Sequence, residues 1–148
     1  MIVDIKKMLI PTDFSENASQ AMEYGVQLAQ RLGAKVLLLH VIPLGTYVSA
    51  ASSAPLPAEA IDALAASART NLSDQGAKLS KSYGVPVEVL VVDGPAPAMI
   101  ADLAKAQGSD LIVMGTQGRT GLKHVLLGSI AEHVVRHSTI PVLTYRHR

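Results

Sequence analysis

The chain has 148 residues, of which 49% are hydrophobic and 17% are charged, and its formal net charge is +1. These numbers predict one globular domain over residues 1–148 with a buried core, and they exclude a disordered chain. The near-neutral charge, together with four Tyr, one Phe and no Trp, gives no reason to expect nucleic-acid binding. Cysteine is absent, which excludes disulfides, thiol catalysis and thiolate metal sites.

No segment of the sequence suggests a membrane protein. The first residues carry charges at Asp4, Lys6 and Lys7 and lack the apolar core of a signal peptide. No apolar run approaches the length of a membrane span. We therefore expect a cytoplasmic protein that does not bind a membrane.

Strand and helix signals alternate through the first half of the chain. Residues 7–12 and 35–41 are short apolar runs, which are typical of buried strands. Between them, small and apolar residues recur at helical spacing over 16–32, and Gly33 is placed to end this helix. A strand, a helix and a second strand predict a right-handed βαβ unit with parallel strands.

The same alternation continues in the second half. Residues 42–57 are rich in Pro, Gly, Ser and Ala without periodicity, so we expect a mobile loop. The elements that follow are a helix over 58–83, a strand over 85–92, a helix between Pro95 and Gly108, a strand over 111–114, a helix from Ser129 and a strand over 140–145. Five strands and four helices predict an open, doubly wound α/β sheet of the Rossmann-like class.

The stretch over 110–135 is typical of a phosphate-binding site. Its apolar run ends at Met114, a loop rich in glycine and basic residues follows, and Gly128 precedes the last helix. Ser129 and Glu132 fit a capping box, with Ser129 as the N-cap. The unpaired N–H groups of a first helical turn and the helix dipole favour an anion, and glycines let the backbone approach a phosphate closely.

The spacing Gly115-x2-Gly118-x9-Gly128-Ser129 resembles the nucleotide-binding signature of the universal stress protein family, in its ATP-binding branch. The resemblance extends from KKMLIPTDFSENA near one end of the chain to STIPVLTYR near the other. No G-x4-GK-[ST] run occurs, and no G-x-G-x-x-G follows a strand. The resemblance implies strand order 3-2-1-4-5, with the first and fourth strands adjacent at a topological switch point, where α/β sheets bind ligands.

The resemblance also implies which residues hold the nucleotide. Asp13 would bind a ribose hydroxyl, whereas the residues alone leave open that Asp13 or Ser15 caps the next helix. The backbone of Val41 would hold the edge of the base, although its side chain is equally suited to the core. The candidate nucleotide-binding residues are Pro11, Thr12, Asp13, Val41, Met114, Gly115, Gly118, Arg119, Gly128, Ser129 and Ile130.

Several of these residues have an ordinary alternative. The three loop glycines and the serine would cradle the phosphates, or they form a surface loop before a capped helix. Arg119 would face the triphosphate, or it is a solvated surface arginine. Met114 and Ile130 would flank the nucleotide, or they pack in the core. Pro11 and Thr12 would supply backbone contacts and shape.

The sequence offers no catalytic or protein-held metal site. No set of nucleophile, base and orienting group can be assembled, and Mg²⁺ would be held mainly by the phosphates of ATP. His133 and His137 have a spacing compatible with a metal, but no third ligand is near, so we expect a solvated helix face. His40 is expected in the core or the crevice, and His124 would touch phosphate or solvent.

We therefore predict an ATP-binding universal stress protein, in which ATP acts as a switch in the stress response with little or no hydrolysis. A homodimer joined through the edge strand 140–145 is expected from its exposed edge and from the family resemblance. Two alternatives stay open. One is a slow ATPase or an adenylyl- or phosphoryl-transfer enzyme in the same crevice, and the other is a dimeric interaction protein that holds no nucleotide.

Overall fold

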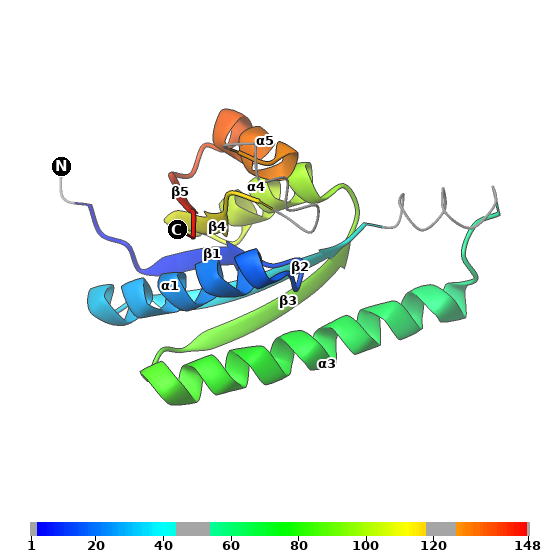
Figure 1. Cartoon of the computed structure of the whole chain (residues 1–148), viewed down its shortest axis with the longest axis horizontal. Helices are drawn as coiled ribbons and strands as arrows, with labels where there is room; N and C mark the ends of the chain where they lie inside the picture. The colour runs from blue at the N-terminus through cyan, green and yellow to red at the C-terminus, as the bar shows by residue number, and fades with distance from the viewer. Residues whose placement is uncertain (1–2, 44–53, 118–126, 148) are drawn as a thin grey trace.

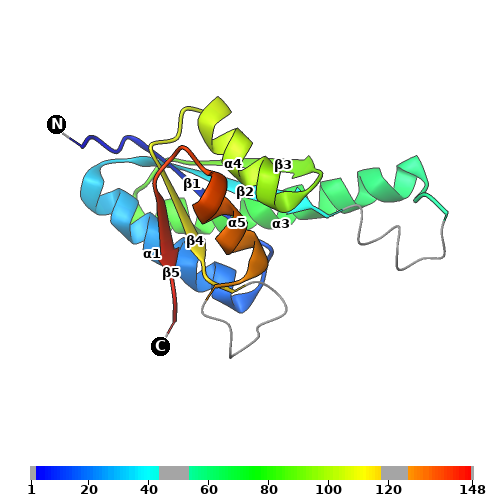
Figure 2. The ribbon, with the colours of Figure 1, turned by 90° about the horizontal axis from the view of Figure 1, so that it is seen from above.

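The computed structural model describes residues 3–43, 54–117 and 127–147, which form a five-stranded parallel sheet in the order β3-β2-β1-β4-β5. Helices α1 and α3 cover one face, and α4 and α5 cover the other (Figure 1, Figure 2). The elements are β1 (Lys7–Pro11), α1 (Glu16–Leu32), β2 (Lys35–Ile42), α3 (Ala58–Tyr83), β3 (Val87–Asp93), α4 (Ala96–Ala106), β4 (Leu111–Gly115), α5 (Ser129–His137) and β5 (Val142–Tyr145). The predicted α/β class and strand order are confirmed.

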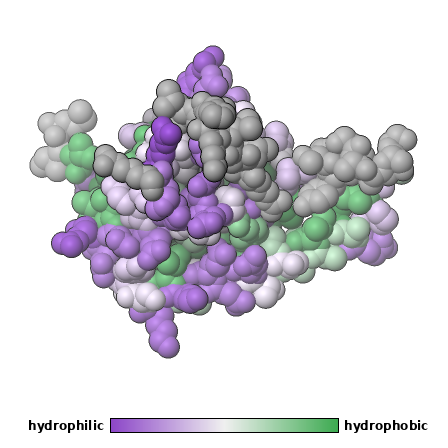
Figure 3. Space-filling view, viewed as in Figure 1, coloured by the Kyte–Doolittle hydropathy of each residue, from purple (hydrophilic) through white to green (hydrophobic). Residues whose placement is uncertain are grey.

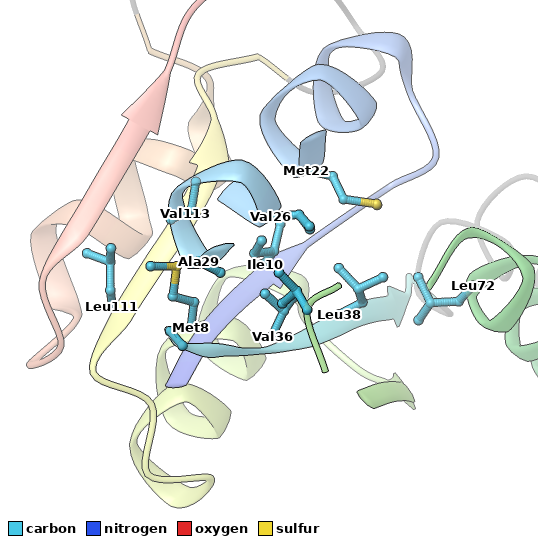
Figure 4. Close-up of a cluster of buried hydrophobic side chains, with 12 residues drawn as sticks. Met8, Ile10, Met22, Val26, Ala29, Val36, Leu38, Leu72, Leu111 and Val113 are labelled. Atoms are coloured by element: carbon cyan, nitrogen blue, oxygen red, sulfur yellow. The ribbon is translucent and has the colours of Figure 1, made fainter. Parts of the chain in front are cut away.

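Each face of the sheet has its own apolar core. Under α1 and α3, Figure 4 shows alternate strand residues packed against the inner faces of the helices: Met8, Ile10, Val36, Leu38, Leu111 and Val113 with Met22, Val26, Ala29 and Leu72. Under α4 and α5, the intervening strand residues are buried: Leu9, Leu37, Leu39, Val41, Ile112 and Met114. Because successive strand side chains point to opposite faces, each continuous apolar run supplies both cores.

Most element boundaries agree with the predicted ones. Gly33 and Gly84 end α1 and α3 with φ of 67° and 66°, a conformation that glycine adopts without a Cβ clash. Strands β3 and β5 each begin two residues later than predicted, at Val87 and Val142, directly after a proline that has no N–H for the ladder. Ile42 belongs to β2 and not to the predicted loop, and the loop's residues 44–53 lie outside the described residues.

Helix α3 buries its inner face over only part of its length. Ala68, Leu72 and Gly76 are its buried residues, whereas Ile61 and Leu64 in its first half are half-buried. In the space-filling view of Figure 3, hydrophobic side chains gather along this first half of the helix. The contacts of α3 with the core therefore come from the part of the helix that follows Leu64, with Leu72 in the core cluster.

Candidate functional site

The site predicted at the switch point lies where β1 and β4 run side by side. The two strands pair through Met8 with Leu111 and Leu9 with Ile112, and their chains then lead to helices on opposite faces. The end of β4 touches the start of α1, since a Cβ placed on Gly115 would lie 3.3 Å from the carbonyl oxygen of Asn17. Two segments about a hundred residues apart thus meet at the carboxyl edge of the sheet, where such folds bind ligands.

The turn after β1 is held by its own side chains. Asp13 Oδ1 accepts a hydrogen bond from the Ser15 N–H at 2.9 Å, and Thr12 Oγ1 accepts one from the Phe14 N–H at 3.1 Å. Ser15 is the N-cap of α1, because its hydroxyl oxygen accepts from the Ala18 N–H at 3.2 Å. Of the two caps that the sequence left open, the structure has Ser15, so Asp13 does not cap the helix.

The turn also contains a contact between Phe14 and His40 that the sequence did not predict. Phe14 has φ 64°, the one positive φ of a non-glycine residue in the described ranges, and such a backbone costs about 1–2 kcal/mol. Its ring lies against the His40 imidazole with centroids 4.4 Å apart. His40 Nδ1 lies 2.8 Å from the Thr12 carbonyl oxygen, and His40 is 6% exposed. The predicted burial of His40 is confirmed.

The backbone N–H and C=O of Val41 point to the side of β2 on which β1 lies. The last bond of the β1–β2 ladder runs from the Thr12 N–H to the Leu39 carbonyl at 2.8 Å, whereas the Ile42 carbonyl accepts from Gly94 on the β3 side. Since these directions alternate along a parallel strand, the N–H and C=O of Val41 point to the β1 side, where β1 has already turned away. Its side chain is buried under α4 and α5, so both expected roles are compatible.

The predicted capping box at α5 is wrong. Gly128 is the N-cap, with φ −67° and ψ 162°, and its carbonyl accepts the Glu132 N–H at 2.8 Å. The Gly128 N–H donates to the Thr116 carbonyl at the end of β4, which fixes Gly128 as the last residue before the helix. Ser129 is therefore the first helical residue, and Glu132 instead pairs with Arg136 at 2.7 Å.

With glycine as its N-cap, the first turn of α5 is suited to bind an anion. Glycine has no side chain with which to cap the first turn, so the N–H groups there are not satisfied by their own N-cap. Ser129 is exposed and its hydroxyl is not the cap. The competition between capping and phosphate contact that a serine N-cap would face does not arise in this structure.

The remaining candidate residues divide into three groups. Pro11 is the last residue of β1 and is half-buried, and Thr12 follows it and is buried. Met114 is buried and Ile130 half-buried in the core under α4 and α5, which supports their packing role. Gly118, Arg119 and His124 lie outside the described residues.

Three further observations concern metal sites and membrane spans. Within residues 3–43, 54–117 and 127–147, no group of three or more His, Cys, Asp or Glu side chains could hold a metal ion. The rings of His133 and His137 stack with centroids 4.1 Å apart, and His137 Nδ1 lies 2.9 Å from the His133 carbonyl. In the same part of the chain, no helix has the length and apolar character needed to cross a membrane.

Comparison with known proteins extends over nearly the whole chain. The family model described as "Universal stress protein family" matches residues 4–146. Universal stress protein MJ0531 of Methanocaldococcus jannaschii is 32% identical over 95% of this chain and 82% of its own length. MJ0577 of the same organism is 32% identical over 100% of this chain and 99% of its own. The solved structure of MJ0577 has a TM-score of 0.85 at 33% identity and covers 99% of both chains.

Two more distant structures of this fold contain nucleotides. One is a universal stress protein in complex with cAMP, with a TM-score of 0.71 and 21% identity over 97% of this chain and 98% of that one. The other is the universal stress protein of Archaeoglobus fulgidus in complex with dAMP, with a TM-score of 0.66 and 20% identity over the same shares. At such identities the likeness to this chain is one of fold. The family match and the relatives at 32% identity show that the chain belongs to the universal stress protein family.

Proposed function

We propose that this protein binds ATP at the carboxyl ends of β1, β2 and β4, and that ATP occupancy acts as a switch with little or no hydrolysis. The observation that carries the proposal is the convergence at this edge of three polar features. These are the Asp13 turn, the outward backbone of Val41, and the first turn of α5 behind a glycine N-cap. Adenine nucleotides in two distant relatives of the same fold are consistent with it.

Each part of ATP has a matching group. The N–H and C=O of Val41 provide a donor and an acceptor for the edge of the base. Asp13 supplies carboxylate oxygens for the ribose hydroxyls, since its turn lies beside the end of β2. The N-terminal end of α5, with Ser129 and the loop residues Gly118 and Arg119, would hold the phosphates by N–H groups, dipole and charge. Mg²⁺ would be held mainly by the phosphates and water.

Slow or absent hydrolysis follows from the roles assigned to these groups. A general base must reach the water that attacks the γ-phosphate. Asp13 would lie at the ribose, and one of its oxygens already accepts the Ser15 N–H. ATP would then act by binding one conformation or assembly better than another, because a ligand shifts an equilibrium only by its differential affinity. We place this switch in a cytoplasmic homodimer joined through the β5 edge.

Mass spectrometry of the purified protein under native and denaturing conditions tests the proposal, together with calorimetric titration and an assay of phosphate release. Retained ATP, or saturable ATP binding without release of phosphate, supports it. Retained ADP or AMP with steady phosphate release would favour the enzyme. If nothing is retained and titration gives no binding, the nucleotide proposal is wrong.

A further inference from the structure

We infer that His40 is a positioning residue for the nucleotide site, because its imidazole holds the turn after β1 in the shape that presents Asp13. The inference rests on the proposed function, since the shape of this turn affects binding only if the nucleotide binds there. His40 itself would not touch the nucleotide. It acts through the residues on either side of Asp13.

The first contact is a buried hydrogen bond. His40 Nδ1 lies 2.8 Å from the carbonyl oxygen of Thr12, and both residues are only 6% exposed. A carbonyl oxygen only accepts hydrogen bonds, so Nδ1 carries the proton and donates it. In a buried setting, a carbonyl that loses its donor is left without the water that would otherwise replace it, which makes this contact costly to remove.

The second contact is the Phe14 ring. It packs on the imidazole at 4.4 Å between centroids, while the Phe14 backbone has φ 64°. A bulky residue stays in this conformation only where surrounding contacts hold it there. The imidazole thus touches the residue before Asp13 through its carbonyl and the residue after Asp13 through its ring.

The same hydrogen bond explains how β1 leaves the sheet. Continuation of the β1–β2 ladder past the bond from Thr12 to Leu39 would pair the Thr12 carbonyl with the Val41 N–H. The imidazole of His40 supplies a donor to that carbonyl instead. The His40 side chain therefore supplies the donor for the last carbonyl beside β2, so the chain can turn at Asp13 and the Val41 N–H is not used by the β1–β2 ladder.

Two variants separate the hydrogen bond from the bulk of the side chain. In His40→Asn, the Nδ2 group is the same number of bonds from the backbone as Nδ1 of histidine and can donate to Thr12. His40→Leu keeps an apolar side chain of similar size without any donor. We expect His40→Leu to weaken ATP binding about tenfold by calorimetry, and His40→Asn to stay within about threefold of wild type.

A nucleotide-free readout reports the turn itself. In His40→Leu, the Phe14 and Ser15 amides should exchange with deuterium about tenfold faster, whereas the Val26 amide in the middle of α1 should be unchanged. In His40→Asn, all three amides should resemble wild type. A merely structural role of the ring would change Val26 together with the turn, and asparagine would not rescue either measurement.

The inference is overturned if His40→Leu binds ATP as wild type does, and in that case the proposed function stands. It is also overturned if His40→Asn is as weak as His40→Leu. If wild type binds no nucleotide, the proposed function fails, and this inference fails with it. Should His40→Leu not fold, nitrogen NMR of wild type still decides, because a proton on Nε2 alone would exclude the bond to Thr12.

Discussion

The Asp13 carboxylate has one observed role and one proposed role, and substitutions can separate the two. Its Oδ1 atom accepts the Ser15 N–H within the turn, and the group is proposed to bind a ribose hydroxyl. Asp13→Ala removes both functions and should weaken ATP binding by about 1.5–3 kcal/mol, or roughly tenfold to a hundredfold. Asp13→Asn keeps an Oδ1 acceptor for Ser15 while it removes the charge, so a smaller loss is expected. Calorimetric titration with ATP measures both.

A ribose contact also has a ligand-side control. Deoxy-ATP lacks the 2′-hydroxyl. If Asp13 binds this hydroxyl, Asp13→Ala should weaken the binding of deoxy-ATP less than the binding of ATP. The affinities of wild type and Asp13→Ala for ATP and for deoxy-ATP form a double-mutant cycle. Its coupling energy measures the contact between Asp13 and the 2′-hydroxyl. If wild type and Asp13→Ala bind ATP with equal affinity, Asp13 does not bind the nucleotide and its role is limited to the turn.

The starts of α1 and α5 differ at the level of the element. Ser15 caps α1 through its hydroxyl, whereas α5 begins behind Gly128 and has Ser129 inside its first turn. Ser15→Ala should therefore lower the free energy of unfolding by about 1 kcal/mol in a urea titration. Ser129→Ala should change it by less than about 0.5 kcal/mol, yet weaken ATP binding. A loss of stability in Ser129→Ala equal to that in Ser15→Ala would contradict the observed cap.

Gly128→Val tests the proposed phosphate contact. The backbone at Gly128, with φ −67° and ψ 162°, is one that valine adopts readily, so no backbone strain is expected and the protein should fold. The added methyl groups would stand beside the first N–H groups of α5 and displace the phosphates. Affinity for ATP should fall much more than affinity for adenosine.

The comparison requires a Gly128→Val variant whose circular dichroism spectrum matches wild type. Gly128→Ala, with its single methyl group, provides an intermediate step on the same backbone. An equal loss of ATP and adenosine affinity would mean that the start of α5 does not hold phosphate.

The contrast between local and non-local causes explains what the sequence could predict. The ends of α1 and α3 follow from Gly33 and Gly84, each of which acts on its own helix, and both were predicted to the residue. At the start of α5, the Gly128 N–H donates to the carbonyl of Thr116, which directly follows β4. The capping-box pattern involves only neighbouring residues, so the sequence alone suggested it. The bond to Thr116 joins residues that are not neighbours in the chain, and no local pattern reveals it.

The candidate site shows the same division. The strand order that the family resemblance implied is the observed one. Asp13 follows β1 and Val41 lies near the end of β2, as the apolar runs predicted, whereas their contacts with a nucleotide stay a prediction. The positive φ of Phe14 has no local signal, because phenylalanine is disfavoured in this conformation and the contact that supports it comes from His40 on β2.

At the scale of the whole molecule, β5 lies at one end of the sheet order and is expected to join two copies. The Pro141 carbonyl accepts from Ile112 of β4, and the Tyr145 carbonyl accepts from Thr116, which directly follows β4. By alternation, the N–H of Thr144 points away from β4 toward the open edge. Light scattering at micromolar concentration should give twice 15.6 kDa for wild type and for Thr144→Ala. Thr144→Pro, which removes this N–H, should shift the mass toward the monomer.

A wild-type protein that scatters as a monomer would exclude this dimer. A Thr144→Pro variant that stays dimeric would place the interface elsewhere. Because proline is tolerated at sheet edges, the variant is expected to keep its fold, which its circular dichroism spectrum verifies.

The pairing of β1 with β4 has a consequence for the order of folding. It begins where the Lys7 N–H donates to Asp110, 103 residues further along the chain, and continues through the pairing of Met8 with Leu111. A pairing that closes so long a loop gains its contacts only after the chain entropy has been lost, so it is expected to form late.

The proposed nucleotide site takes residues from both β1 and β4, so it would form only after these two strands have paired. ATP should then stabilise the native state without stabilising the transition state for folding. In stopped-flow measurements, saturating ATP should leave the refolding rate unchanged. Nearly all of the stabilisation by ATP should then appear as a lower unfolding rate. Faster refolding in ATP would mean that the two sides of the site meet before the rate-limiting step.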